Sequence, residues 1–284
     1  MKIIKNIVMM LMAVVLLASC GEQNTKKVSI AYANWAEGIA MSNLAKVVLE
    51  EQGYKVALKN ADIAPIFASL AAKDVDLFLD SWLPITHEDY FAKYGDKLHV
   101  LGTLFDDAKV GLVVPTYIDI NSIEELNVNK DKFNKEIVGI DTGAGIMRST
   151  DEAIKEYGLD MKLLSSTGPM MVAALDKAIK ANEWVVVTGW KPHYKFGKYD
   201  LKFLEDSKNV YGDAELIKSV CWKGFEEQDP FVVEFIGNMH FDTEQIGALM
   251  AEVESATSEI KGAQKWLDKN RDLVNKWIPK TVDK

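Results

Sequence analysis

The sequence contains an internal repeat, because the segment from about 28 to 90 can be laid over the segment from about 136 to 197. The first copy reads VSIAYANWAEGIAMSN, YKVALKNADIAPIFASL and VDLFLDSWLPITH, and the second reads EIVGIDTGAGIMRST, MKLLSSTGPMMVAAL and EWVVVTGWKPHY. Gly38 falls opposite Gly145 and Trp82 falls opposite Trp190, at offsets of 107 and 108 residues. Two copies of a unit this long predict two similar lobes rather than a solenoid.

Each copy has the pattern strand, helix, strand, helix, strand, because short β-rich runs alternate with segments of helical periodicity. In the first helix Leu44, Val47 and Val48 form one apolar stripe. We expect Gly53 to end this helix and Gly158 to end its counterpart, since glycine accepts the left-handed turn that follows a helix. The alternation predicts an α/β fold with parallel sheets, whose ligand crevice lies beyond the carboxyl ends of the strands.

Three tryptophans lie where predicted strands end, which is where such a crevice would be. Trp82 and Trp190 close the third strand of their copies, and Trp35 follows the first strand of the first copy. An indole face is the best side-chain binder of a quaternary ammonium group, and aromatic cages are its usual receptor. The alternative is burial in the core. We expect core positions for the other four tryptophans, the last three of them in helical segments: Trp184, Trp222, Trp266 and Trp277.

A second candidate site is the Gly145-Ile146 pair, which follows a predicted strand and opens a predicted helix. Backbone N–H groups at a helix start bind anions with the help of the helix dipole. The alternative is a tight turn without a ligand, and GAGIM lacks the spacing of a nucleotide-binding loop. His87, five residues after Trp82, is a candidate donor to a carboxylate. His193 in the matching turn of the second copy is the rival candidate.

The N-terminal segment predicts export from the cytoplasm. Lysines precede an apolar run from 7 to 17, which is too short for a membrane span but suits a signal peptide over residues 1–19. The run ends in LASC, which resembles the bacterial lipobox and makes Cys20 the expected site of lipidation. An ordinary signal peptide that happens to contain a cysteine is the alternative. Residues 20–27 would then be a tether to the membrane surface, where several acyl chains anchor firmly.

The length of 284 residues suits two lobes of moderate size. We expect residues 28–115 to form the first part of lobe I and residues 116–212 to form lobe II. The segment 213–284 is predicted to be a helical return that packs on lobe I. Crossing strands between the lobes are expected at GLVVP (111–115) and near 205–220.

The charge of the chain excludes one class of partner. Removal of residues 1–19 takes away two lysines and changes the formal net charge from −9 to −11. An acidic body of this kind argues against nucleic acid binding. If Cys20 is acylated, Cys221 is the one remaining cysteine, so no intramolecular disulfide is expected.

The segments ANWAEGIAM, KNADIAPIFASL, DSWLPITHEDY, KVGLVVP, DTGAGIM and TGWKPHY resemble the glycine betaine substrate-binding proteins of ABC importers over essentially the whole mature chain. The resemblance implies a two-lobe α/β fold of the type II periplasmic-binding-protein kind, with the ligand cleft between the lobes. It also implies a membrane permease as partner and no cofactor. By the same resemblance, three tryptophans surround the trimethylammonium group, and two amides and a histidine meet the carboxylate. The residues that match are Trp35, Trp82 and Trp190 for the cage and Gly145, Ile146 and His87 for the carboxylate.

Two other functions remain open at this point. The first is a receptor for choline or carnitine, or one that serves a signalling partner. The second is an extracytoplasmic enzyme acting on choline-type substrates, with His87, Asp80 or His193 in acid–base or metal chemistry. No G-x-S-x-G or H-E-x-x-H motif and no Cys/His cluster of metal-ligand spacing supports the enzyme. The arrangement of the residues therefore favours a receptor that closes on its ligand by hinge motion.

Overall fold

A computed structural model describes residues 26–280 of the chain. The expected signal peptide, the lipidation at Cys20 and most of the tether lie outside these residues. Among the helices that are described, none combines the length and the apolar character needed to cross a membrane.

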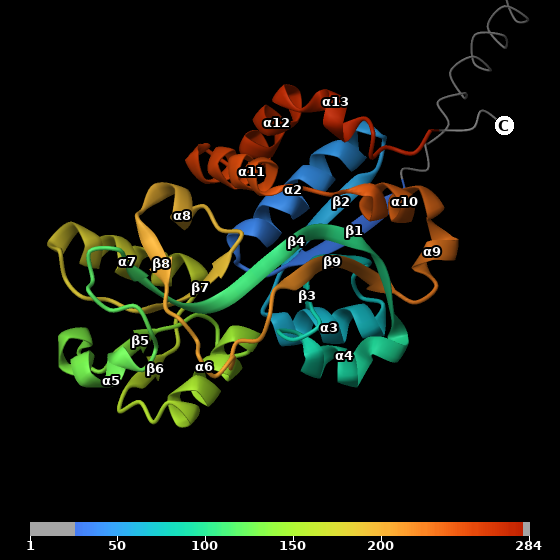
Figure 1. Cartoon of the computed structure of the whole chain (residues 1–284). Helices are drawn as coiled ribbons and strands as arrows, with labels where there is room; N and C mark the ends of the chain where they lie inside the picture. Colours follow the sequence, from blue (N-terminus) through green and yellow to red (C-terminus); the bar gives the residue numbers. More distant parts are fainter. Residues whose placement is uncertain (1–25, 281–284) are drawn as a thin grey trace, which may run out of the picture.

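The two copies of the repeat form two α/β lobes (Figure 1). Lobe I contains β1 (Lys27–Tyr32), α2 (Ala36–Glu51), β2 (Lys55–Asn60), α3 (Ile63–Ala72), β3 (Leu77–Leu83), α4 (Glu88–Tyr94) and the 3-10 helix η1 (Gly95–Lys97). Lobe II contains α5 (Glu125–Asn129), the 3-10 helix η2 (Lys130–Phe133), β5 (Glu136–Val138), α6 (Gly145–Glu156), β6 (Lys162–Leu164), α7 (Gly168–Ala181), β7 (Val187–Lys191), α8 (Lys195–Lys198) and β8 (Leu201–Phe203). The predicted order of strand, helix, strand, helix, strand is thereby confirmed in both copies, and Gly53 and Gly158 have the expected positive φ of 86° and 60° just beyond their helices.

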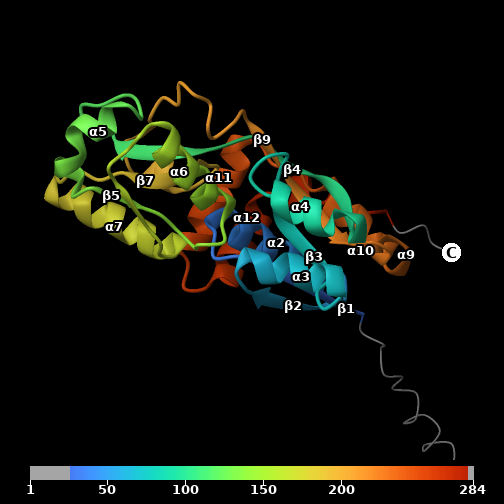
Figure 2. The same cartoon turned by 90° about the horizontal axis from the view of Figure 1, so that it is seen from below.

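Two strands connect the lobes, β4 (Leu98–Pro115) and β9 (Glu215–Trp222). The first part of β4 pairs with β9, and its last part, which includes GLVVP, pairs with β7 and β8. The strand order is β2-β1-β3-β9-β4-β7-β5-β6, with β8 beside β4. Strands within each copy are parallel as expected, whereas β4 and β9 run antiparallel to their neighbours. Figure 2 shows β4 passing from one lobe to the other.

The C-terminal helices return to lobe I and pack on α2. They are α9 (Phe225–Gln228), α10 (Pro230–Asn238), α11 (Thr243–Ser255), α12 (Glu259–Lys269) and α13 (Arg271–Val274). Both α11 and α12 contact α2, which in turn contacts β1 and β3. On the other side of these strands lie α3 and α4 (Figure 1). Helix α2, with Trp35 as its N-cap and Glu37 in its first turn, is therefore held between the strands of lobe I and the C-terminal helices.

Two expectations for the tryptophans were wrong, since Trp222 lies in strand β9 and Trp277 lies in the turn that follows α13, so neither is in a helix. The segment ELIKSVCW is a short apolar run, and periodicity alone does not separate a buried strand from a helix in such runs. Its pairing with β3 on one side and β4 on the other makes it a strand. Trp222, Trp266 and Trp277 are buried as expected, while Trp184 is only partly buried.

Gly262 allows α12 to approach α11 closely. A Cβ atom at this position would lie 2.5 Å from both the carbonyl oxygen of Glu252 and the Cα atom of Val253, which are backbone atoms. We therefore expect Gly262→Ala to lower the free energy of unfolding by about 1–3 kcal/mol. In the control Gly247→Ala in α11, the added methyl meets nothing within 4 Å, and a gain of about 0.5–1 kcal/mol is expected. Urea unfolding measures both, and equal stabilities of the two variants would contradict the close packing of α11 and α12.

Candidate functional site

Side chains from both lobes line one cavity that contains all six candidate residues. The unfilled space between them is about 290 Å³, part of it continuous with solvent. The lining residues are Trp35, Glu37, Trp82, Thr86, His87, Val110, Ile140, Ala144, Gly145, Ile146 and Trp190.

The three tryptophans reach the cavity from strand ends. Trp82 is the penultimate residue of β3 and Trp190 the penultimate residue of β7, and Trp35 is the N-cap residue of α2, three residues after β1 ends. Trp82 lies opposite Ile217 of β9, and Trp190 lies opposite Val110 of β4, so both rings are placed beside the connecting strands. All three side chains are almost fully buried, yet each borders the cavity.

Each of these indoles donates its N–H to a carboxylate. Hydrogen bonds to a charged acceptor are about twice as strong as neutral ones and fix the orientation of the ring. Two of these bonds join the two lobes: Trp35 donates to Asp141 at 3.3 Å and Trp190 donates to Glu37 at 2.9 Å. The third bond lies within lobe I, where Trp82 donates to Asp80 at 2.8 Å.

Sequence reasoning did not assign these carboxylates to the cage. A local signal exists for two of them, since Glu37 stands two residues after Trp35, and Asp80 stands two residues before Trp82. Neither spacing indicates which indole the carboxylate accepts from. Glu37 accepts from Trp190, which is 153 residues away in the chain.

Three ionisable side chains are buried behind the cage. Burial raises the pKa of Glu37 to about 7, although the Trp190 N–H and the Lys195 ammonium lower it. Burial, and then the charge of Glu37, raise the pKa of Asp80 well above its ordinary value. Burial also lowers the pKa of Lys195, whose Nζ lies 4.1 Å from the ring centroid of Trp190. The charge of this cluster is therefore not fixed at neutral pH.

Gly145 and Ile146 are the first two residues of α6, and Ala144 is its N-cap. The first amides of a helix have no partner within the helix, and among the residues that the structure describes no side chain caps this end. The first turn also contains no acidic residue. A Cβ atom at Gly145 would lie 2.0 Å from the carbonyl oxygen of Thr86 in lobe I. Only glycine lets the two lobes approach this closely.

His87 is fully buried, and its ring adds a further donor to the cavity wall. Its Nδ1 accepts the backbone N–H of Trp82 at 2.9 Å, so the proton of the neutral ring is on Nε2. Burial, and then the nearby Arg148 charge, lower the pKa of His87 to about 3, so the ring is neutral at physiological pH. Nε2 has no hydrogen-bond partner within residues 26–280.

The turn that carries His87 is held by Glu215 at the start of β9. Oε1 of Glu215 accepts the backbone N–H groups of Ile85 and Thr86 at 2.7 and 2.8 Å, and Oε2 accepts the hydroxyl of Thr86. Glu215 is buried, so this contact couples the turn directly to a connecting strand.

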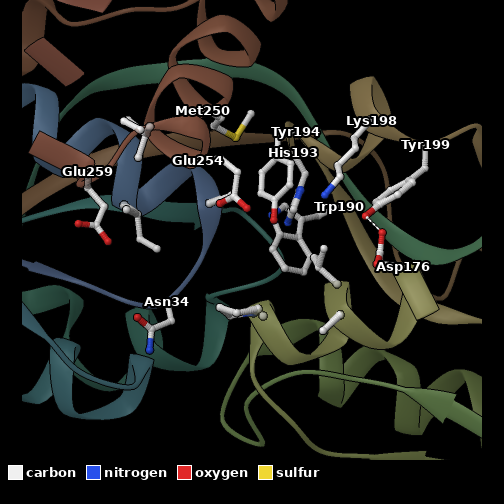
Figure 3. A pocket seen from close by; sticks show the side chains of 18 of the residues that line it. Asn34, Asp176, Trp190, His193, Tyr194, Lys198, Tyr199, Met250, Glu254 and Glu259 are labelled. Carbon is white, nitrogen blue, oxygen red and sulfur yellow. Dashed lines mark hydrogen bonds between the residues drawn. The ribbon is translucent and has the colours of Figure 1, made fainter. Parts of the chain in front are cut away.

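His193, the rival of His87, does not line the cage cavity. Its Nδ1 accepts the backbone N–H of Lys195 at 3.1 Å, and its ring packs edge-on against Trp190. It faces a larger groove of about 1300 Å³, again including space open to solvent, between α7, α8 and α11. Figure 3 shows this groove with His193 and Tyr194 opposite Glu254.

The family model of the substrate binding domain of ABC-type glycine betaine transport system matches residues 26–269. A relative in Listeria monocytogenes, the glycine betaine/carnitine transport binding protein GbuC, is 43% identical over 150 residues. These are 52% of this chain and 50% of that protein, so the match spans about half the length of this relative.

Solved structures extend the similarity over most of the chain. Lactococcal OpuAC in its closed-liganded conformation with glycine betaine has a TM-score of 0.85 and 34% identity, and the match covers 89% of this chain and 100% of that one. The glycine betaine/L-proline-binding protein ProX from Borrelia burgdorferi has a TM-score of 0.86 and 34% identity over 90% and 97% of the two chains. A choline binding protein of an ABC transporter, solved with choline, shares the fold at 23% identity and a TM-score of 0.81.

The raised pKa of Glu37 makes the stability of the protein depend on pH. A carboxyl whose pKa is higher in the folded state than in the unfolded state stabilises the fold below its unfolded pKa, and this contribution is lost as pH rises through the folded pKa. With a folded value of about 7, the loss between pH 4.5 and pH 8 is about 3 kcal/mol. Glu37→Gln removes it, so the stability of this variant relative to wild type should rise over that range in urea unfolding.

An exposed glutamate serves as the control for this titration. Glu152 on α6 is exposed, and Glu152→Gln should keep a constant stability difference from wild type across the same pH range. If Glu37→Gln also gives a constant difference, Glu37 does not titrate in the folded protein near pH 7.

Proposed function

Because this chain belongs to the family of substrate-binding domains of ABC-type glycine betaine transport systems, we propose that it binds glycine betaine between its lobes and delivers it to the permease of an ABC importer. The observation that carries the proposal is the convergence of three indole faces and an uncapped helix N-terminus on one small cavity. Such a cavity offers aromatic faces to a cation and N–H donors to an anion, which are the two ends of a betaine.

The cation end of the ligand would lie among Trp35, Trp82 and Trp190. A quaternary ammonium group has no N–H to donate, so a carboxylate in direct contact gains only Coulomb energy while it loses its own hydration. An aromatic face loses little hydration, and each contact is worth about 0.5–2 kcal/mol depending on desolvation. The cage therefore favours a methylated cation over the ammonium group of glycine, which needs acceptors.

The carboxylate end would be met by the amides of Gly145 and Ile146 and by Nε2 of His87. Helix N-termini bind anions through free N–H groups and the helix dipole. A neutral histidine with its proton on Nε2 is a donor without a charge of its own. Choline lacks a carboxylate and leaves these donors without an anionic partner.

The names of the relatives agree with this ligand. The Listeria relative is named for glycine betaine and carnitine, and lactococcal OpuAC was solved in complex with glycine betaine. Carnitine and choline also have a trimethylammonium head, so they are the ligands to compare with glycine betaine.

We further propose that lobe I begins with residues 28–115, that lobe II is residues 116–212, and that 213–284 return to lobe I. The ligand would bridge the lobes, because Trp35 and Trp82 belong to lobe I and Trp190 belongs to lobe II. Closure by hinge motion would then bend the connecting strands β4 and β9. The closed form is the state that a permease would distinguish from the open one.

The location that we propose is the outer face of the bacterial cell membrane. It rests on the predicted signal peptide of residues 1–19 and on the lipobox that ends at Cys20. A receptor anchored there would supply the importer with an osmolyte, and uptake of glycine betaine would protect the cell against osmotic stress.

Tryptophan fluorescence of the protein without residues 1–20 tests the ligand directly. We expect a saturable change with glycine betaine at about micromolar concentration, which corresponds to ~8 kcal/mol. The response should be weak with choline and absent with glycine. Trp190→Ala should abolish it, whereas Trp184→Ala, at a partly buried site that packs edge to face with Phe133, should keep it. If none of the three compounds changes the fluorescence, the assignment of the ligand must be withdrawn.

Gly145→Ala tests whether ligand binding requires close approach of the lobes. The new methyl would lie 2.0 Å from the Thr86 carbonyl oxygen, so it holds the lobes apart and should weaken glycine betaine binding at least tenfold, or about 1.4 kcal/mol. At Gly143, in the turn that precedes α6, the nearest atom to an added methyl is the Tyr90 hydroxyl at 3.5 Å. Gly143→Ala should bind normally by isothermal titration calorimetry, and equal affinities of the two variants would exclude this role of Gly145.

A further inference from the structure

The carboxylates that accept from the cage indoles come from three different elements. Glu37 lies in the first turn of α2, Asp80 lies in β3, and Asp141 lies in the loop between β5 and α6. Each one binds the N–H at the edge of an indole rather than its face. These hydrogen bonds therefore leave the ring faces uncovered, while Nζ of Lys195 lies 4.1 Å from the ring centroid of Trp190.

Two of these bonds cross between the lobes, and they do so in opposite directions. Trp35 of lobe I donates to Asp141 of lobe II at 3.3 Å, and Trp190 of lobe II donates to Glu37 of lobe I at 2.9 Å. The third bond, between Trp82 and Asp80, lies within lobe I and does not depend on closure. Two rings of the cage are thus fixed only when the lobes are together.

A carboxylate at the edge of an indole also changes the face of the ring. The indole N–H is part of the positive edge of the ring, whereas the two π faces are negative. Hydrogen bonds in a low-dielectric interior polarise the groups that they join, so donation to an anion makes the faces more negative. A cation on the face gains from this polarisation and from the nearby negative charge, whereas a neutral group of the same shape does not.

The surroundings of Glu37 and Asp80 point to a missing positive charge. Both are almost fully buried, and a buried carboxylate without a counter-charge is costly. Oδ2 of Asp80 has no hydrogen-bond partner within residues 26–280. The charge of Lys195 acts on Glu37, but burial lowers the pKa of Lys195 well below its ordinary value. A bound cation in the cage would supply the charge that the protein does not.

On the basis of the proposed function, we propose that Glu37 and Asp141 are positioning residues that complete the cage when the lobes close and make it prefer a cationic head group over a neutral one of the same shape. They act through Trp190 and Trp35 and not by contact with the ligand.

The test compares glycine betaine with 3,3-dimethylbutanoate, its carbon isostere, in which a neutral tert-butyl group replaces trimethylammonium. Binding is measured for the full-length protein and for its variants Glu37→Gln and Asp141→Asn. Each variant keeps an oxygen acceptor for the indole but removes the charge of the carboxylate. We expect each variant to bind glycine betaine about tenfold more weakly, a change of about 1.4 kcal/mol, and to bind the isostere with an affinity close to that of wild type.

Glu88→Gln is the matched control for lobe closure. Glu88 of lobe I forms an exposed ion pair with Arg148 of lobe II at 2.6 Å and touches no cage indole. Loss of this ion pair should change the affinities for glycine betaine and for the isostere by the same factor. If Glu37→Gln and Asp141→Asn also change both ligands equally, or change neither, the inference is overturned.

Indole N–H resonances give a second readout that does not depend on the isostere. In protein with ¹⁵N-labelled tryptophan and saturating glycine betaine, Glu37→Gln should shift the Trp190 indole proton upfield, and Asp141→Asn should shift that of Trp35. Unchanged resonances would also overturn the inference. If the wild-type protein does not bind glycine betaine at all, that result contradicts the proposed function and is distinct from a failure of the roles assigned to Glu37 and Asp141.

Discussion

The hydrogen bonds between indoles and carboxylates across the cleft are the interaction on which the rest of the site depends. A tryptophan at a strand end is held by its backbone only up to Cβ, and the ring still has to be oriented. Because the acceptors of Trp35 and Trp190 lie in the opposite lobe, the orientation of each ring depends on how the two lobes are placed relative to one another. The connecting strands β4 and β9 and the packing of α11 and α12 on α2 bring these partners within reach.

The ionisable groups buried around the cavity make an unfavourable electrostatic contribution to folding. Buried carboxyls with raised pKa values, a buried lysine with a lowered one and a neutral histidine all stand within one layer of the cage. Each would be more stable in water, so the local structure persists only because the surrounding core fixes it. Gains in stability are expected from neutral replacements at such positions, and these residues are consistent with the proposed role of the cavity in ligand binding.

Much of the architecture was predictable from the sequence because its signals are local. The repeat predicted the order of strands and helices in both lobes, and strand ends placed Trp35, Trp82 and Trp190 at one edge. A returning strand was expected near 205–220 and is found as β9 at Glu215–Trp222, but Trp222 itself was assigned to a helical segment. The apolar run has no decisive period, and pairing with two neighbours makes it a strand. The partners of the indoles were not predictable either, since Glu37 and Trp190 meet only through the relative placement of two lobes. The same placement explains why His87 lines the cage cavity whereas His193 lines the larger groove between α7, α8 and α11.

The two copies of the repeat have the same order of elements but make opposite ends of the cavity. In the second copy α6 begins at Gly145, preceded by Ala144, and its first turn has no acid, so its amides stay free for an anion. In the first copy the helix begins two residues before Gly38, and its first turn carries Glu37. A Cβ at Gly38 would lie 2.5 Å from Oδ2 of Asp80, so carboxylates crowd the position that corresponds to the free amides. One helix start therefore offers free N–H donors and the other offers carboxyl groups, and the orientation proposed for the betaine places its anionic end at the first and its cationic end at the second.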